Sequence, residues 1–346
     1  MNNIKKVLVT GVTGQDGYNM CKYLLKNTNY LIYGTTRREQ DNIFFENKKF
    51  KTKFLDLSDN TSIEEAFLEI KPDFFINFAG QSSVNDSWKK PESTFKVNSL
   101  SIIYILEIIR KFKPSCRFYS AGSSEEFGDI HVTPQTLEHP LKPRSPYGAS
   151  KCAARHIVKV YRDSYNIFAI HCVLFNHEGT RRNKKFVTRK ITHNLARIKF
   201  EIDNGKIPEP FELGNINIKR DWSDSEDFIE AIWLMLNKNE PNEYILSSNE
   251  SHSIEDFINI SCQCLNLDYK WKKTDNPLDT KLYVNNYLVM KISEKFFRPA
   301  DLDIMIGDCS GTLKELNWKP KINFENLVKK MTLHDYNLIR NNSITK

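Results

Sequence analysis

Two stretches of the chain carry side chains that could move protons: Ser123, Ser124 and Glu125, followed by Tyr147 and Lys151. A spacing of four residues places Tyr147 and Lys151 on one face of a helix, one turn apart. A free tyrosine ionises near pH ~10, but an ammonium group beside it favours the phenolate. Such a tyrosine could take a proton from a sugar or alcohol hydroxyl while hydride leaves the same carbon. Ser123 could hydrogen-bond that hydroxyl, and Glu125 could serve as a second acid or base.

Each of these motifs is also typical of an ordinary structural role. Tyrosine and lysine four residues apart are common on helix surfaces, and Ser-Ser-Glu is a good helix cap followed by an acidic first turn. The chemical interpretation therefore depends on whether a nucleotide site lies nearby. The elements that would have to build such a site come earlier in the chain.

A glycine-rich turn follows the first apolar run of the chain. Residues 7–10 are typical of a buried parallel strand, and Gly11, Gly14 and Gly17 come directly after it. An amphipathic helical pattern then begins. A glycine turn between strand and helix lets backbone amides approach a pyrophosphate at the helix N-terminus. The spacing differs from the usual G-x-G-x-x-G, so an ordinary turn is the alternative, but the strand–turn–helix context favours a nucleotide loop.

The charge after the second predicted strand indicates which dinucleotide would bind. Residues 31–35 are typical of a strand, and Arg37 and Arg38 follow it, about 20 residues past the glycines. NAD-binding proteins usually place an acid there for the ribose 2′-hydroxyl, whereas arginines would pair a 2′-phosphate. We therefore predict NADP, with a solvated basic turn as the alternative.

Alternating strands and helices predict the fold. Further strands are expected at 54–57, 74–78 and 117–120, and a long helix is expected after Pro91. This order is typical of a doubly wound parallel sheet, in which ligands bind at the carboxyl ends of the strands. The stretch 123–125 follows a strand at that edge, which strengthens its chemical interpretation.

Composition excludes several classes of protein. The chain has 346 residues and a net charge of +7, which suits an anionic ligand without requiring nucleic acid. Seven scattered cysteines indicate a reducing compartment, so we expect a cytoplasmic protein without a signal peptide. Cys262 and Cys264 have no partner pair, and the sequence predicts no metal site. No apolar run is long enough to span a membrane.

A basic loop forms the other candidate binding region. Six positive charges fall within residues 181–190, a density that is also found in nucleic-acid patches and solvated faces. Phe186 is the one aromatic residue inside, so base stacking would be poorly served. We favour contacts to a diphosphate, for which arginine and lysine are suited.

Together, the glycine turn and the Tyr147–Lys151 pair resemble the extended branch of the short-chain dehydrogenase/reductase superfamily. Longer matches narrow the resemblance to the GDP-mannose 4,6-dehydratase family, with GDP-manno-heptose 4,6-dehydratases among its relatives. It extends from near Ile4 to near Met331. The stretches that carry it are 10–17, 37–38, 176–178, 181–182, 186–191, 213–215, 220–222, 297–299, 307–309 and 317–320.

The resemblance implies a role for each matched residue. Tyr147 would deprotonate the sugar 4-hydroxyl, with Lys151 tuning it. Glu125 would remove the C5 proton and protonate the departing C6 hydroxyl, and Ser123, in place of the family's threonine, would hold the 4-oxygen. The implied NADP contacts are Gly11, Thr13, Gly14, Gln15, Asp16, Gly17, Arg37, Arg38, Asp56, Leu57, Phe78, Ala79, Gly80, Gln81, Ser82, Tyr147, Lys151, His177 and Arg182. The implied GDP-sugar contacts are Ser82, Ser123, Asn176, Val187, Lys190, Arg220 and Arg298.

The implied reaction is an NADP-dependent 4,6-dehydration of a GDP-sugar, a hydro-lyase step of deoxysugar biosynthesis with internal hydride transfer from C4 to C6. Departures from the family, such as Glu126 and Phe127 in place of Leu-Tyr, leave GDP-mannose and GDP-manno-heptose both open. An NADPH-dependent 4-keto-6-deoxy sugar nucleotide reductase is the alternative enzyme. A catalytically silent NADP-binding regulator is a third hypothesis, disfavoured because Glu125, Tyr147 and Lys151 are all present.

The predicted fold is α/β: a Rossmann-type doubly wound parallel sheet with a smaller α/β C-terminal substrate lobe. We expect the NADP-binding domain in residues 1–176 plus 215–248, and the sugar-nucleotide-binding lobe in 177–214 plus 249–346. The resemblance implies a homodimer or homotetramer with residues 37–38 near an inter-subunit contact. Neither nucleic acid nor a membrane is expected as a partner.

Overall fold

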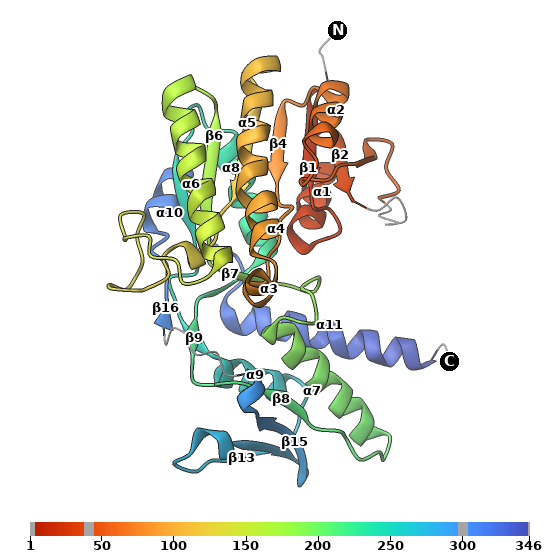
Figure 1. The fold of residues 1–346 in the computed structure, drawn as a ribbon. Coiled ribbons are helices and arrows are strands. Elements are labelled where there is room, and N and C mark those ends of the chain that lie inside the picture. Colours follow the sequence, from red (N-terminus) through yellow and green to blue (C-terminus); the bar gives the residue numbers. More distant parts are fainter. Residues whose placement is uncertain (1–3, 38–44, 297–303, 345–346) are drawn as a thin grey trace. The chain divides into compact units, whose positions relative to one another are not determined.

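The structure is a computed structural model that describes residues 4–37, 45–296 and 304–344. The chain forms two compact units, which are described separately (Figure 1). The first unit consists of Met1–Phe175, Ser225–Asn249 and Gly307–Pro320, and the second of Asn176–Asp224, Glu250–Ile306 and Lys321–Lys346.

The first unit is built on one sheet of seven parallel strands in the order β3-β2-β1-β4-β5-β6-β11. The chain starts in the middle, runs to one edge and then returns to fill the other side. This order confirms the predicted doubly wound sheet. The strands are β1 (Lys6–Thr10), β2 (Leu31–Thr36), β3 (Phe50–Phe54), β4 (Phe74–Asn77), β5 (Arg117–Ala121), β6 (Ala169–Leu174) and β11 (Glu243–Leu246).

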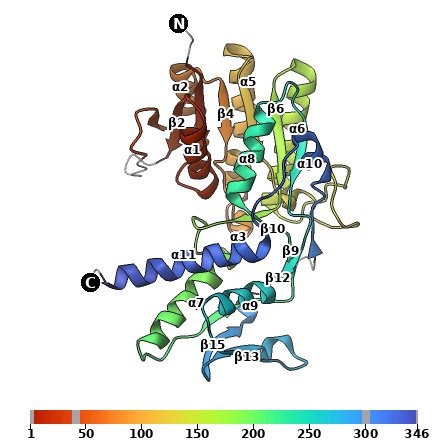
Figure 2. The ribbon, with the colours of Figure 1, turned by 180° about the vertical axis from the view of Figure 1, so that it is seen from behind.

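Helices cover both faces of this sheet. One face carries α2 (Asn60–Ile70), α5 (Ser101–Phe112) and α6 (Pro146–Tyr165), with α5 and α6 side by side in Figure 1. The other face carries α1 (Gln15–Asn27), α8 (Ser225–Leu236) and α10 (Ser310–Leu316), which Figure 2 shows from behind.

Burial on both faces of the sheet explains why the central strands are continuous apolar runs in the sequence instead of alternating apolar and polar residues. Val7, Leu8 and Val9 of β1 are all fully buried. Val7 and Val9 join the hydrophobic cluster under α1 and α8, whereas Leu8 joins the cluster under α2, α5 and α6. Successive side chains point to opposite faces, and because both faces are covered, both sets must be apolar.

The third strand was predicted in the wrong place. It was expected at 54–57, but β3 spans Phe50–Phe54. Leu55 and Leu57 are buried, 2% and 3% exposed, yet they reach the core from a turn. In that turn the Asp56 carboxylate accepts two hydrogen bonds at 2.8 Å, one from the backbone N–H and one from the hydroxyl of Ser58. β3 is the edge strand of the sheet and is partly exposed, so it lacks the apolar run that marks the inner strands.

The helix expected after Pro91 is interrupted. It consists of α4 (Pro91–Phe95), a π-helical segment η1 (Lys96–Leu100) and α5, and it follows the short α3 (Val84–Lys89). A π segment inserts one extra residue into the helix and often marks a functional position. Here it carries a buried asparagine that contributes to the site described below.

The second unit combines small sheets with long helices. A two-stranded sheet pairs β7 (Asn176–Glu178) with β10 (Trp222–Asp224), and β9 (Lys219–Arg220) lies between β12 (His252–Ser253) and β16 (Ile304–Met305). Its other elements are β8 (Phe211–Leu213), β13 (Tyr269–Lys272), β14 (Lys281–Val284), β15 (Tyr287–Ile292), α7 (Val187–Asp203), α9 (Ile254–Cys264), α11 (Phe324–Ile344), η3 (Pro277–Asp279) and η4 (Glu294–Phe296). No helix in the described parts of either unit is long and apolar enough to cross a membrane.

The boundaries of the two units differ from the expected domain limits at two segments. Residues 215–224 were expected with the large sheet, but β9 and β10 within them pair with strands of the second unit. Residues 307–320 were expected in the C-terminal lobe, but they belong to the first unit. There Gly307 forms a bridge with Gln135, and α10 contributes to the core beside α8.

A buried ion pair joins α7 and α11 of the second unit. Arg189 is 5% exposed and Asp335 is fully buried. Arg189 Nη2 donates to Asp335 Oδ1 at 2.6 Å, and Nε donates to Oδ2 at 2.8 Å. Arg189 also donates to the carbonyl oxygens of Thr180 and Arg182, and Thr192 Oγ1 donates to Asp335 at 2.6 Å. One of the six cations of the basic loop is therefore an internal support of that loop.

Replacing Asp335 by alanine should destabilise the protein strongly, because it leaves the Arg189 guanidinium buried without its counter-ion. We expect the free energy of unfolding to fall by about 3–5 kcal/mol, measured by urea denaturation. Glu325→Ala is the control, because it breaks an exposed pair with Lys329 and should leave stability unchanged within error. Equal stability of the two variants would contradict a structural role for the buried pair.

Candidate active site

The first unit joins the ends of β1 and β4 at the point where the strand order reverses. Thr10 Oγ1 donates to Asn77 Oδ1 at 2.6 Å, and the backbone N–H of Ala79 donates to Thr10 Oγ1 at 2.9 Å. Ligands of doubly wound sheets bind outside the carboxyl ends of the strands at this switch point. The turns 11–17 and 78–82 therefore meet at the edge where the sequence predicts a nucleotide.

The three glycines after β1 each meet a different geometric need. Gly11 has φ +70°, and a Cβ there would lie 2.9 Å from the backbone nitrogen of Ala79. A Cβ on Gly17 would lie 2.4 Å from the Gly11 carbonyl oxygen, so Gly17 lets α1 pack onto the turn. At Gly14, the N-cap of α1, the Gly11 oxygen at 3.2 Å is the one neighbour among the described residues, so its outer side is open. Tight turn, close packing and open approach are the three roles of glycine in a dinucleotide loop.

Polar side chains surround this turn. Thr13 is exposed, and Gln15 is largely buried, with its Nε2 donating to Asp16 Oδ1 at 3.1 Å. Arg37 directly follows β2 and is exposed. Arg38 lies outside the described residues. The structure thus places one of the two predicted arginines at the carboxyl end of β2.

Asn98, in the π segment η1, is a site residue that the sequence did not reveal as functional. Its Oδ1 accepts from the N–H of Gln81 at 2.9 Å, and its Nδ2 donates to the Gln81 carbonyl at 3.0 Å and to Ser150 Oγ at 3.1 Å. Ser150 Oγ in turn donates to the carbonyl oxygen of Tyr147 at 2.7 Å. Asn98 therefore fixes the turn 78–82 to the first turns of α6. The sequence gives no clear signal for it, because residues 91–101 contain many other polar side chains.

The Ser123–Glu125 turn lies against the start of α6. Ser123 Oγ caps the short helix η2 (Ser124–Glu126), accepting from the Glu125 N–H at 3.3 Å, so the capping role is real. A Cβ on Gly148 would lie 2.5 Å from the Glu125 carbonyl oxygen. Tyr147 is 9% exposed, and Ser145 caps α6 by accepting from the Gly148 N–H at 3.0 Å. Because Gly148 has no side chain, Glu125 and Tyr147 belong to backbone segments in direct contact.

Lys151 lies one turn after Tyr147 and is half-buried. Its Nζ donates to the carbonyl oxygen of Ala121 at 2.6 Å and lies 5.9 Å from the centre of the Tyr147 ring. Burial lowers the pKa of Lys151 to about 8, and the nearby Glu126 carboxylate acts in the opposite direction. The structure therefore brings a cation close to Tyr147, as the four-residue spacing predicted.

In the second unit, β7 and the start of α7 are brought together. Asn176 and His177 lie on β7, and Val187 is the first residue of α7. Thr188 Oγ1 donates to Glu178 Oε2 at 2.7 Å and ties the first turn of the helix to the strand. Three predicted ligand contacts thus lie on elements that touch.

Two cations of the basic loop each lie over an aromatic ring. The guanidinium carbon of Arg182 lies 3.7 Å from the centre of the Phe186 ring, and its Nε lies 3.1 Å from Glu178 Oε2. Lys190 Nζ lies 3.8 Å from the centre of the Phe296 ring, and partial burial lowers its pKa. Rings of this kind hold a cation in place without neutralising it.

The remaining predicted substrate contacts are not gathered at β7. Arg220 lies on β9, a strand of a different small sheet, and its Nη1 donates to the Lys219 carbonyl at 2.9 Å. Arg298 lies outside the described residues. The predicted ligand contacts of the second unit therefore lie on two different small sheets and on α7.

The sheet, the glycine turn and the tyrosine–lysine pair define a dinucleotide-binding α/β protein with an acid–base site at the same edge. The profile of the family described as GDP-mannose 4,6 dehydratase matches residues 8–331. The chain is 36% identical over 356 residues to GDP-mannose 4,6 dehydratase of Drosophila melanogaster, covering 98% of this chain and 88% of that protein. It is 34% identical over 350 residues to GDP-mannose 4,6 dehydratase of Homo sapiens, covering 97% and 92%. The chain belongs to the GDP-mannose 4,6-dehydratase family, which confirms the resemblance seen in the sequence.

A solved structure supports the fold separately. UDP-glucose 4-epimerase from Thermotoga maritima, solved with UDP-glucose, matches with a TM-score of 0.79 over 96% of this chain and 99% of that chain. The two sequences are 19% identical, so this likeness shows the common fold alone.

The first unit fits the NADP that the family implies. The open side of Gly14 leaves room for a pyrophosphate at the N-terminus of α1, where a helix favours an anion. Arg37 is exposed where a ribose 2′-phosphate would need a positive charge. No side chain would have to be removed from the turn to make room for the phosphates.

The lowered pKa of Lys151 predicts a pH-dependent stability. Because the folded state binds this proton less tightly than the unfolded state, the cost of the buried ammonium is complete below about pH 8 and is released as the pH rises towards 10.5. Lys151→Met removes that cost. The free energy of unfolding of the variant minus that of wild type should therefore be largest below about pH 8 and shrink across this window.

Urea denaturation at about pH 7 and about pH 10 measures this difference. Lys159→Met, at an exposed position of the same helix, is the control and should show a constant difference. A constant difference for Lys151→Met as well would mean that burial does not perturb Lys151.

Proposed function

We propose that this chain catalyses the 4,6-dehydration of a GDP-sugar, GDP-mannose or GDP-manno-heptose, to the 4-keto-6-deoxy sugar, as an NADP-dependent hydro-lyase. The observation that carries the proposal is the contact between the Ser123–Glu125 turn and the first turn of α6, beside the glycine turn. Family membership at 36% identity over nearly the whole chain supports the same reaction.

The first proton transfer falls to Tyr147. Its phenolate takes the proton of the sugar 4-hydroxyl, and the buried Lys151 ammonium stabilises that phenolate. The Ser123 hydroxyl donates a hydrogen bond to the 4-oxygen. When bound, NADP supplies the hydride acceptor at C4 and, once reduced, the hydride donor at C6.

The second proton transfer falls to Glu125. The 4-ketone acidifies the C5 hydrogen, and the Glu125 carboxylate removes it. The same proton then passes to the C6 hydroxyl, which leaves as water. Glu125 is half-buried, and its carbonyl oxygen lies against Gly148, the residue after Tyr147. Reduction at C6 requires a proton at C5, which is taken up from solvent, while Tyr147 releases the proton of the 4-hydroxyl to solvent. One carboxylate is thus base and acid in turn, and the cofactor ends in its starting state.

The proposed ligand contacts follow from the family resemblance. Residues of turns 11–17, 37–38, 56–57 and 78–82 would hold NADP, together with His177 and Arg182. The GDP-sugar would be held by Ser82, Asn176, Val187, Lys190, Arg220 and Arg298. Arg182 and Lys190, held against aromatic rings, are suited to pair phosphate oxygens.

Assembly and location are also proposed from the family resemblance and the cysteines. A homodimer or homotetramer, with residues 37–38 near the contact between subunits, is the expected assembly, and its size can be measured by sedimentation. All seven cysteines are free thiols and six are buried, which supports the cytoplasm as the compartment.

A GDP-sugar deuterated at C4 tests the reaction directly. We expect the label at C6 of a product that has lost one water, because the hydride moves within one molecule. Mass spectrometry and NMR of the product measure this. A reductase would instead consume NADPH in proportion to product, so sustained NADPH consumption or loss of the label to solvent would contradict the proposal.

Glu125→Gln should abolish dehydration while leaving nucleotide binding intact. Loss of a general acid–base should lower kcat by about 10²–10⁴-fold, and deuterium from solvent should no longer enter at C5. Glu138→Gln, an exposed position of the loop between β5 and α6, is the matched control and should keep wild-type turnover. Unchanged turnover of Glu125→Gln would exclude Glu125 as the acid–base.

A further inference from the structure

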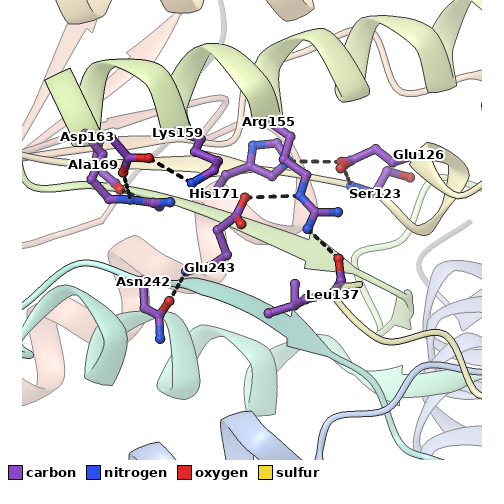
Figure 3. A network of polar contacts seen from close by, with 11 residues as sticks. Ser123, Glu126, Leu137, Arg155, Lys159, Asp163, Ala169, His171, Asn242 and Glu243 are labelled. Carbon is purple, nitrogen blue, oxygen red and sulfur yellow. Dashed lines mark hydrogen bonds and ion pairs between the residues drawn. The ribbon is translucent and has the colours of Figure 1, made fainter. Parts of the chain in front are cut away.

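Directly behind the Ser123–Glu125 turn lies a buried pair that the proposed reaction does not use. Glu126, the last residue of η2, and His171, on β6, are both fully buried at their side chains. His171 Nε2 lies 3.0 Å from Glu126 Oε1, and Figure 3 shows this contact joining the turn to the sheet. Two ionisable side chains in a dry interior are costly unless they serve each other or a neighbour.

The Glu126 carboxylate also fixes the turn itself. The backbone N–H of Ser123 donates to Glu126 Oε1 at 2.7 Å, which completes the capping box of η2 (Figure 3). Cys152 Sγ on α6 donates to the Glu126 carbonyl at 3.2 Å. Glu126 is therefore bonded to its own turn, to β6 and to α6, the three elements that must keep Ser123, Glu125 and Tyr147 in register.

The glycine at position 122 makes room for the pair. A Cβ on Gly122 would lie 2.5 Å from His171 Nε2 and 2.8 Å from Glu126 Oε1. Gly122 therefore allows the carboxylate and the imidazole to meet directly over the end of β5. A site that is closed this tightly holds its members in one geometry.

Glu126 is also the acidic group that acts on Lys151. Burial lowers the pKa of Lys151, and Glu126 is the one charged group that raises it again. The other titratable groups that face Glu126 are His171 on β6, Cys152 on α6 and Cys172 on β6. The positive charge of Arg155 lowers the pKa of Cys152, and Arg155 itself forms an ion pair with Glu243.

We propose that Glu126 is a positioning residue for the proposed reaction: its carboxylate anchors the Ser123–Glu125 turn to β6 through His171 and supplies the negative charge that keeps the Lys151 ammonium next to Tyr147. The inference rests on the proposed function and deepens it. Glu125 and Tyr147 act on the substrate, whereas Glu126 determines where the first is held and how readily the second ionises.

The substitution Glu126→Gln removes the negative charge of the side chain but keeps its size and shape. A glutamine oxygen can accept the same bonds from Ser123 and His171, so the turn keeps its anchor while the negative charge disappears. Lys151 then loses its proton more easily and stabilises the Tyr147 phenolate less. The Lys151 amine, followed by its NMR signal and identified by the absence of that signal from Lys151→Met, should therefore titrate about one pH unit lower in Glu126→Gln than in wild type.

Because the proposed reaction needs Lys151 in its protonated form, the same shift should move the basic limb of the pH profile of kcat to lower pH, so that kcat at a fixed pH on that limb falls about tenfold. KM should stay close to wild type, because no group that binds the sugar nucleotide changes. Glu243→Gln is the matched control: it neutralises a half-buried carboxylate paired with Arg155 at 3.1 Å, and it should leave the titration and the profile in place (Figure 3).

His171→Asn tests the anchor independently of the charge and also serves if Glu126→Gln fails to fold. The carboxylate stays, so the titration of Lys151 should not move, but kcat should fall because the turn is no longer fixed to β6. An unchanged titration in Glu126→Gln, or full kcat in His171→Asn, would overturn the inference. The titration needs neither substrate nor turnover. If wild type fails the deuterium test, the proposed dehydration is refuted, but the titration still decides whether Glu126 acts on Lys151.

Discussion

Direct backbone contact, with no side chain in between, is the constraint on which the site depends. The carbonyl oxygen of Glu125 lies 2.5 Å from where a Cβ of Gly148 would be. At the end of β5, Gly122 leaves the same kind of space for the pair formed by Glu126 and His171. Because both positions are glycine, the turn after β5 can press against the first turn of α6, and the carboxylate and the phenol come from touching segments. A methyl group at either position would separate the elements by more than a proton transfer tolerates.

The same close packing determines the electrostatic surroundings of Lys151. Its ammonium group is buried against the carbonyl of Ala121, which supplies a partial negative charge, and Glu126 supplies a full one nearby. Burial alone would make the ammonium easy to deprotonate, and each pKa unit corresponds to about 1.4 kcal/mol. The balance of burial and carboxylate leaves a lysine that is charged at neutral pH yet poorly shielded by water. Its effect on the neighbouring phenol is correspondingly strong.

The second unit shows how far counting charges along a sequence can mislead. The basic loop supplies six cations, but Arg189 is 5% exposed and is neutralised by Asp335, so it supports the loop from inside. Arg182 and Lys190 instead lie over aromatic rings, and Arg182 also pairs with Glu178 at 3.1 Å. The distinction between a supporting and a ligand-binding cation depends on burial and on the partner, and neither can be read from charge density.

The sequence by itself determined the features that depend on neighbouring residues: the order of strands and helices, the glycine turn after β1, and the tyrosine–lysine spacing on α6. These follow from local periodicity, from positive φ at Gly11 and from one helical turn, and the structure has all three. Tertiary structure decided the features whose partners are distant in the chain. Glu126 and His171 are 45 residues apart, and Arg189 and Asp335 are 146 apart. Tertiary structure also decided that residues 307–320 belong to the first unit, and where β3 lies, because β3 is an edge strand with a weak apolar pattern. A local pattern fixes backbone conformation, but only the folded chain determines which buried polar group finds a partner, because that depends on which surfaces meet.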